Sequence, residues 1–260
     1  MSGVTTRIYL TGRLGLERDG ALVDQDAFGG RQGALVFARL LLPRGHAVSR
    51  DELAALLWGG ALPRAWDVAL NAVVSKLRSL LVKAGFDKAG VLPSALGCYQ
   101  LNLPAHAWLD VEAALESLHA AEVMLKRDRH RDAWAAAQVA YHILKRPFFP
   151  AETCEWAVRQ REQLTALFAR SGECLAETYV HNGEASLAAD IAGQVVAAQP
   201  FRESAYQILM RAQAIAGNRA EALRSYEECK HRISEHLGVR PSADTEAVYM
   251  AILRERPAGT

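Results

Sequence analysis

The stretch from Val48 to Ala84 constrains the fold most strongly, because it reads as two helices separated by a loop. Ser49 is followed three residues later by Glu52, and this spacing predicts a capping box that starts a helix near Arg50. A Gly-Gly pair then ends that helix. A second helix is predicted from Asp67 to the end of the stretch, since its apolar residues recur at the spacing of one buried helix face.

The opposite face of the second helix is small and polar, with cations along its edges. Such a face suits the major groove of DNA, where a central ridge meets base edges and flanking cations meet phosphates. A solvated surface helix is the alternative, because amphipathic helices with lysine edges are common. The predicted DNA-binding residues are Arg64 in the preceding loop and Asn71, Ala72, Ser75, Lys76, Arg78, Ser79 and Lys83 on the helix.

The segments on either side of the two helices indicate short strands. Upstream, apolar and polar residues alternate around Asp19-Gly20, which predicts a tight hairpin turn. Downstream, a second hairpin is predicted, closed between Pro93 and Gly97. Strands, three helices and a final hairpin together make a winged helix-turn-helix with an additional N-terminal sheet.

Several short motifs carry a family resemblance: Gly29-Gly30-Arg31-Gln32, Val48-Ser49-Arg50-Asp51-Glu52-Leu53, Leu57-Trp58, Val74-Ser75-Lys76-Leu77-Arg78 and Gly97-Cys98-Tyr99. With these motifs, residues 7 to 103 resemble the OmpR-like DNA-binding domain of the Streptomyces antibiotic regulatory protein family. The remainder resembles the bacterial transcriptional activation domain that follows it there. The resemblance implies a transcriptional activator that binds tandem promoter half-sites as a homodimer and recruits RNA polymerase. This chain departs from the family pattern in lacking a cation at the tip of the second hairpin.

The second half of the chain reads as helical repeats. Gly183 and Gly217 lie 34 residues apart, and each is followed five residues later by a small residue, Ala188 or Ala222. This is the period of tetratricopeptide repeats, whose helix pairs stack into a solenoid. We therefore predict a mainly α fold, with a winged helix (α+β) domain at residues 1–104 and an all-α tetratricopeptide-like domain at residues 105–260. The second domain begins with a helix capped by Asp110.

Charge differs between the two halves. Residues 1 to 103 contain 12 Lys and Arg against 8 Asp and Glu, whereas residues 104 to 260 contain 18 against 21. The first half is therefore basic by four charges and the second is acidic by three. This balance is typical of a nucleic-acid-binding module attached to a protein-facing domain, although four charges form only a weak signal.

Motifs for catalysis or cofactor binding are missing from the sequence, so neither an enzyme nor a bound cofactor is expected. The nearest approach to a metal-ligand pair is Glu177 with His181, a spacing more typical of an exposed helical pair. The four cysteines are not closely spaced and indicate reduced thiols. No apolar run is long enough to span a membrane, and a cytoplasmic protein is expected.

Two interpretations remain open. In the first, the winged helix binds double-stranded promoter DNA; in the second, it docks a protein, and the chain is an interaction or ligand-sensing module. The helical domain leaves room for an unidentified small-molecule or protein ligand. Trp66, next to the loop residue Arg64, fits either a contact with a partner such as RNA polymerase or packing against the second helix.

Overall fold

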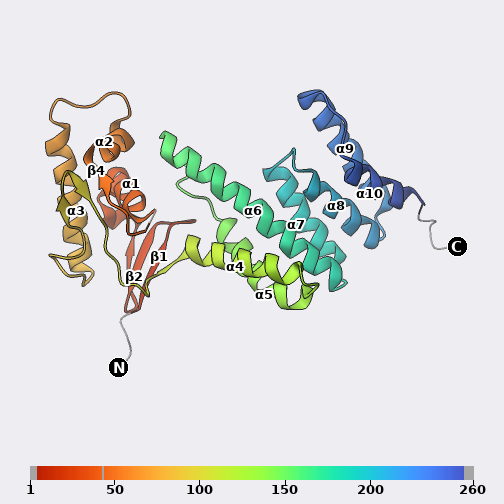
Figure 1. Cartoon of the computed structure of the whole chain (residues 1–260), viewed down its shortest axis with the longest axis horizontal. Helices are drawn as coiled ribbons and strands as arrows, with labels where there is room; N and C mark the ends of the chain where they lie inside the picture. The colour runs from red at the N-terminus through yellow and green to blue at the C-terminus, as the bar shows by residue number, and fades with distance from the viewer. Residues whose placement is uncertain (1–4, 43, 255–260) are drawn as a thin grey trace. The chain divides into compact units, whose positions relative to one another are not determined.

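The computed structural model describes residues 5–42 and 44–254 (Figure 1). A four-stranded sheet with the order β3-β2-β1-β7 comes first. Its strands are β1 (Thr6–Tyr9), β2 (Gly15–Arg18), β3 (Ala21–Asp24) and β7 (Trp108–Leu109). Asp19 and Gly20 both have positive φ, which confirms the predicted tight turn between β2 and β3. Strand β7 runs parallel to β1, with Leu109 opposite Ile8.

Three helices and a small sheet follow, in the arrangement of a winged helix-turn-helix. In chain order they are η1 (Gln25–Phe28), α1 (Gly30–Leu41), β4 (Val48–Ser49), α2 (Arg50–Trp58), α3 (Trp66–Lys83), β5 (Ser94–Ala95) and β6 (Cys98–Tyr99). The small sheet has the order β4-β6-β5. The Ser49 hydroxyl accepts from the Glu52 amide and the Glu52 carboxylate accepts from the Ser49 amide, so the predicted capping box is confirmed. Helix α3 agrees with the predicted second helix to within one residue at each end.

The remaining helices are α4 (Asp110–Leu125), α5 (His130–Leu144), α6 (Glu155–His181), α7 (Ala185–Ala198), α8 (Glu203–Ile215), α9 (Arg219–Leu237) and α10 (Ala243–Arg254). Gly183 and Gly217 follow the ends of α6 and α8 with φ near 80°, the left-handed conformation that favours glycine at a helix end. Ala188 and Ala222 are fully buried on the next helices. The 34-residue period is therefore a structural repeat, and the predicted tetratricopeptide-like fold is confirmed.

The chain forms two compact units whose limits differ from the division at residue 104 that the sequence predicts. The first unit contains the residues up to Glu112 together with Arg146–Arg161, and the second contains Ala113–Lys145 and the residues from Glu162 onward. The first unit extends further because β7 completes its sheet and because the amide of Gly12 donates to the carbonyl of Pro147 at 2.7 Å. The core of the first unit therefore includes residues from the connection between α5 and α6, among them the buried Phe148.

Asp110 is the first residue of α4 and is fully buried. Its carboxylate accepts from the amides of Leu10 and Thr11 at 2.9–3.0 Å and from the Thr11 hydroxyl at 2.8 Å. It also accepts from the amide of Val111. The sequence predicts an N-cap for α4, whereas this carboxylate mainly satisfies the backbone at the end of β1, a contact that no local pattern reveals.

Candidate nucleic-acid interface

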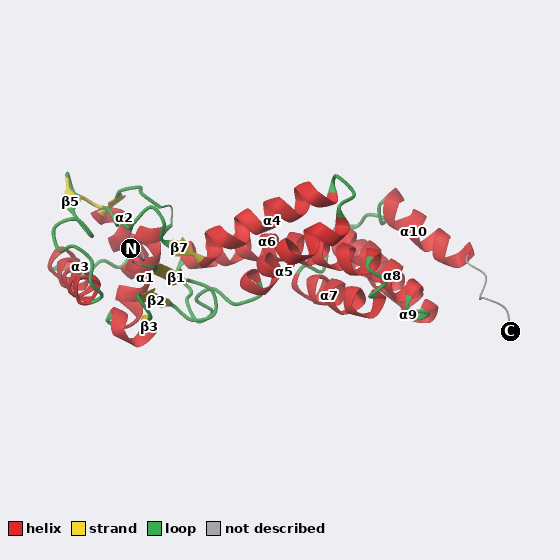
Figure 2. Cartoon of the chain, turned by 90° about the horizontal axis from the view of Figure 1, so that it is seen from below, coloured by secondary structure: helices red, strands yellow, loops and turns green. Residues whose placement is uncertain are grey.

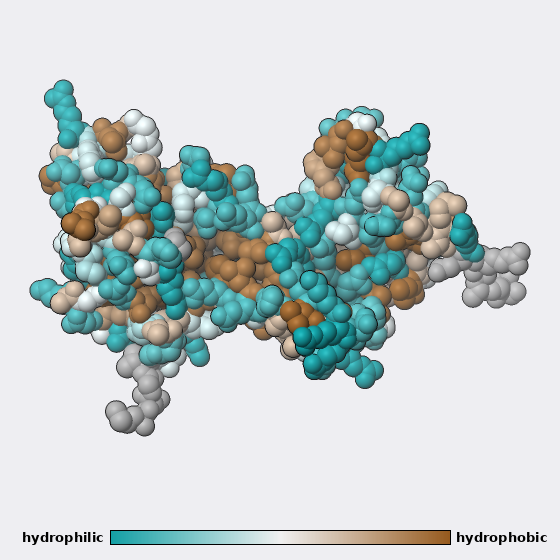
Figure 3. Space-filling view, viewed as in Figure 1, coloured by the Kyte–Doolittle hydropathy of each residue, from teal (hydrophilic) through white to brown (hydrophobic). Residues whose placement is uncertain are grey.

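Helix α3 has one buried face and one open face. Its buried residues are Leu70, Val74, Leu77 and Leu81, as the helical spacing predicts. The exposed ridge contains Val68, Asn71, Ala72, Ser75 and Ser79, and Lys76 and Lys83 are exposed beside it. From residue 68 to the end of the helix there is no Asp or Glu. In Figure 3, hydrophilic residues and small apolar patches are mixed over the surface of α2 and α3.

Arg50 connects α3 to the rest of the winged helix. Its Nη1 atom donates to Asn71 Oδ1 and to the Tyr99 hydroxyl, both at 2.7 Å, and its Nη2 atom donates to the carbonyl of Asp67 at 3.3 Å. The Tyr99 hydroxyl donates to the same Asn71 oxygen at 2.9 Å. Arg50, Asn71 and Tyr99 therefore form a hydrogen-bonded triad, which joins the first turn of α2 to α3 and to β6.

The triad limits what Asn71 can do. A side-chain amide that reads adenine through two hydrogen bonds must accept with its oxygen and donate with its nitrogen. Here Asn71 Oδ1 already accepts from two donors, which use both of its lone pairs. The Nδ2 group remains as the side of Asn71 that can act on a base or phosphate, so Asn71 is arranged as a hydrogen-bond donor.

Arg78 forms a contact within the chain that the sequence does not predict. Its Nε and Nη2 atoms donate to the carbonyl of Leu92 at 3.2 and 2.7 Å, and the residue is half-buried. Arg78 therefore holds the segment that leads into β5, while Lys76 and Lys83 have no ion-pair partner among residues 5–42 and 44–254. Two of the three basic residues predicted on α3 are thus free to meet phosphates.

The hydroxyl group of Ser79 on the ridge forms a hydrogen bond within α3. Ser79 Oγ donates to the carbonyl of Ser75 at 2.9 Å, so its proton is used within the helix and its lone pairs remain as acceptors. Ala72 lies on the same exposed ridge and has the smallest side chain there, which lets another molecule approach the helix closely.

Arg64 lies in the exposed loop between α2 and α3, without an ion-pair partner in the described part of the chain. Trp66 starts α3 and is half-buried, with the guanidinium carbon of Arg50 5.9 Å from the centre of its ring. Trp66 therefore packs against the residue that orients Asn71, which favours the packing interpretation of this tryptophan.

Arg50 and Tyr99 are the interface residues for which the sequence predicts no role. Both occur in the motifs that carry the family resemblance, and Arg50 follows directly after the capping serine. No local sequence pattern indicates that an arginine at the first position of a helix orients a residue on another helix. The bond to Asn71 crosses 21 positions of sequence and becomes visible only in three dimensions.

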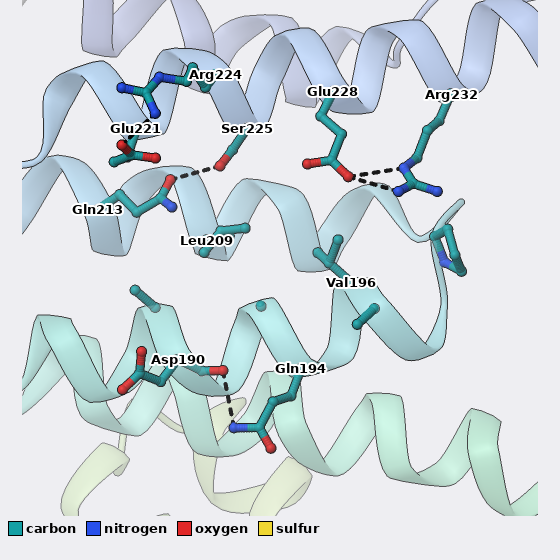
Figure 4. A pocket seen from close by; sticks show the side chains of 14 residues that line it. Asp190, Gln194, Val196, Leu209, Gln213, Glu221, Arg224, Ser225, Glu228 and Arg232 are labelled. Carbon is teal, nitrogen blue, oxygen red and sulfur yellow. Dashed lines mark hydrogen bonds and ion pairs between the residues drawn. The ribbon is translucent and has the colours of Figure 1, made fainter.

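The helical unit has a concave surface between α7, α8 and α9 (Figure 4). It is a groove of about 1040 Å³ with two ion pairs of α9 on one wall, Glu221 with Arg224 and Glu228 with Arg232, at 2.7 and 2.9 Å. Across the groove, Gln213 accepts from Ser225. Because these polar groups pair with one another, the groove indicates no particular ligand.

Glu177 and His181, the nearest approach to a metal-ligand pair, form contacts with other residues. Glu177 forms an ion pair with Arg211, and His181 contacts the backbone carbonyl of Glu177 and stacks on His130 at 3.4 Å between ring centres. Burial raises the pKa of the thiols of Cys174 and Cys229 to about 12, so both stay protonated and unreactive at neutral pH. All four cysteines are free, as predicted. No helix within residues 5–42 and 44–254 is long and apolar enough to cross a membrane.

The chain is similar in sequence to one protein family and to several named regulatory proteins. The sequence profile of the bacterial transcriptional activator domain family matches residues 109–253. The transcriptional regulatory protein MoaR1 of Mycobacterium tuberculosis is 27% identical over 232 residues, which are 85% of this chain and 72% of MoaR1. The regulatory protein AfsR of Streptomyces coelicolor is 27% identical over 241 residues, which are 93% of this chain and 23% of AfsR.

Among solved structures, the chain resembles Mycobacterium tuberculosis EmbR in complex with a low affinity phosphopeptide. The TM-score is 0.84 at 23% sequence identity, and the match covers 98% of this chain and 66% of that one. At this level of identity the similarity concerns the fold. It extends over both the winged helix and the helical repeats.

Proposed function

Because this chain belongs to the bacterial transcriptional activator domain family, among the Streptomyces antibiotic regulatory proteins, we propose that it places α3 in the major groove of promoter DNA. The observation that carries the proposal is the open face of α3, which is uninterrupted by carboxylates after Asp67 and has an oriented amide at its centre. A carboxylate on that face would repel the phosphates. Asn71, held by Arg50 and Tyr99, instead presents a hydrogen-bond donor.

The residues of the interface divide into two roles. Asn71, Ser75 and Ser79 on the ridge read base edges, with Ala72 allowing close approach. Lys76 and Lys83 beside the ridge and Arg64 in the loop contact phosphates, which fixes the register of the protein on the duplex. Arg78 supports the interface from within, through its bonds to the carbonyl of Leu92.

The wider assembly is proposed from the family relationship. Two copies bind tandem half-sites as a homodimer in the cytoplasm, and the complex recruits RNA polymerase to activate transcription. The division of charge supports a basic half on DNA and an acidic half facing protein. The matched region is 72% of MoaR1 and 23% of AfsR, so no activity of their remaining segments is transferred to this chain.

The first test compares Lys76→Ala with Asn71→Ala on duplex DNA selected from a random library by the full chain. Lys76→Ala is expected to weaken binding to all sequences alike and to reduce the slope of log affinity against log salt by about 0.9, one phosphate contact. Asn71→Ala is expected to leave the slope unchanged and to relax one base preference by roughly 1 to 3 kcal/mol. Gel shifts at several salt concentrations measure both.

Lys88→Ala is the matched control, because Lys88 is exposed in the same unit but lies outside α3. If Lys76→Ala and Lys88→Ala had equal effects, or if the full chain selected no sequence at all, the proposed DNA interface would be wrong. The winged helix would then be a protein-docking module.

A further inference from the structure

A small cavity lies in the first unit, between the loop that joins β1 to β2 and the connection between α5 and α6. Residues 146–154 of this connection form neither a helix nor a strand (Figure 2). The amide of Gly12 donates to the carbonyl of Pro147, which holds the connection against the loop. The cavity between them has a volume of about 190 Å³. An engineered cavity of roughly 150 Å³ binds benzene, so a single aromatic ring fits here.

The wall of the cavity is mainly apolar. The loop contributes Leu10 and Leu14, which are buried, and the connection contributes Phe149 and Pro150. Gln25 also lines the cavity and is exposed, so the cavity opens to solvent on that side and a ligand can enter. A ligand that fills this space is therefore small and largely apolar.

Glu152 is the charged residue of the wall. Its Oε2 atom accepts from Arg31 Nε at 2.9 Å and lies 2.8 Å from Arg31 Nη2. Its Oε1 atom accepts no hydrogen bond from residues 5–42 and 44–254, although the side chain is only 12% exposed. A carboxylate oxygen only accepts hydrogen bonds, so a ligand that uses this atom must be a donor. Because Arg31 already compensates the charge, a neutral hydroxyl group suits the atom better than a second cation does.

Phe149 lines the cavity in a backbone conformation that phenylalanine rarely adopts. Its φ is 41°, in the left-handed region that favours glycine. Arg161 fixes this conformation, because its Nη1 atom donates to the carbonyl of Phe149 and its Nη2 atom to the carbonyl of Glu152, both at 2.6 Å. The Phe149 ring packs against the buried ring of Phe148, with 4.8 Å between the ring centres. Glycine would form the same turn without strain, so the turn alone does not account for a phenylalanine. The ring gives the cavity a rigid aromatic wall, and strained residues cluster at ligand sites.

We propose that the cavity binds a neutral, single-ring aromatic molecule with a hydroxyl group, that is, a phenol. The ring packs between the two leucines and Phe149, and the hydroxyl group donates to Glu152 Oε1. Among the described residues, α3 contributes none to the wall of the cavity. The site therefore goes beyond the proposed function and does not depend on it.

Two probes, p-cresol and toluene, test the proposal, because both have a methylated ring and only p-cresol has a hydroxyl group. The full chain, with isotope-labelled leucine methyl groups, is titrated with each probe and followed by NMR. Nuclear Overhauser effects should connect the ring protons of p-cresol to the methyl groups of Leu10 and Leu14. The affinity for p-cresol should exceed that for toluene about tenfold, because its hydroxyl group donates to a carboxylate.

Two variants separate the ligand's hydrogen bond from the ion pair. Glu152→Leu removes both, so p-cresol should lose its advantage and bind as toluene does. Arg31→Met is the matched control, because it removes the ion pair and leaves the carboxylate, and it should keep the preference for p-cresol. Circular dichroism checks that both variants are folded.

The outcomes decide the site and its chemistry. Absence of any effect of p-cresol on Leu10 and Leu14, near the solubility limit of the probe, would overturn the site. Equal affinity of the parent for both probes, or an undiminished preference for p-cresol in Glu152→Leu, would overturn the binding of a hydroxyl group by Glu152. If the variants did not fold, the comparison of the two probes on the parent chain would still decide the proposal. The DNA interface is tested separately, by the base preference of Asn71→Ala.

Discussion

Asn71 lies at the centre of the DNA interface proposed for α3, and two neighbours determine which hydrogen bonds its side chain can form. With Oδ1 occupied by Arg50 and Tyr99, the amide can donate to an acceptor such as guanine N7 or O6 but cannot form the paired bonds that select adenine. If α3 binds DNA as proposed, removing Arg50 or Tyr99 should change both the base preference and the affinity. Arg50 and Tyr99 are positioning residues in this scheme, because they act through Asn71.

This leads to a prediction for Tyr99→Phe and Arg50→Ala. Each substitution removes one donor from Asn71 Oδ1, so the base read by Asn71 should shift toward adenine in a selection from random duplexes. Tyr99→Phe removes no charge and should keep the parental salt slope, which makes it the cleaner variant. An unchanged preference in both variants, with normal folding by circular dichroism, would contradict the triad's role.

For the residues of α3, the sequence predicts which side chains are exposed but not which hydrogen bonds they form. Helical spacing places Ser75, Lys76 and Ser79 on the open face, and the structure agrees. Spacing alone also places Arg78 beside them. Its side chain turns to the carbonyl of Leu92, which is close only after the hairpin has packed against α3, and no local rule contains that information.

Among the elements, the helix pairs depend on small residues where neighbouring helices pack. Ala222 is fully buried on α9, in a cluster with Met210, Tyr226 and Ile252. Replacing it with leucine adds three carbons where the packing leaves no room. We expect Ala222→Leu to destabilise the helical unit by about 1 to 3 kcal/mol, measured by chemical denaturation.

Ala220→Leu is the matched control, because Ala220 is exposed on the same helix and has the same helix propensity change. It should leave the free energy of unfolding within about 0.5 kcal/mol of the parent. Equal stability of the two variants would mean that Ala222 is not a packing point. The sequence predicts this position because a 34-residue period is a long-range pattern that repeats, unlike a single contact.

For the whole molecule, the limits of the two compact units differ from the division at residue 104 that composition predicts. Composition changes clearly near Pro104, where polar and β-branched residues give way to helix formers. The contacts that extend the first unit come from a two-residue strand, one buried carboxylate and a loop between α5 and α6. Each is too short to produce a periodic signal, so the composition and the contacts indicate different limits.

This organisation predicts the behaviour of a fragment that ends at Leu103. Such a fragment lacks β7, Asp110 and residues 146–161, so one edge of the sheet is open and the amides of Leu10 and Thr11 lose their acceptor. Each buried amide without a partner costs about 1 to 3 kcal/mol. The fragment should therefore melt well below the full chain, although its winged helix is complete in sequence.

Asp110→Asn in the full chain isolates the contribution of the carboxylate. Asparagine keeps the size but has a single acceptor oxygen, so it cannot serve the two amides and the hydroxyl together. We expect a melting temperature between those of the fragment and the parent, measured by near-ultraviolet circular dichroism, which reports aromatic packing. A Leu103 fragment as stable as the parent would show that the winged helix is independent of everything after it, and that residues 146–161 merely rest on its surface.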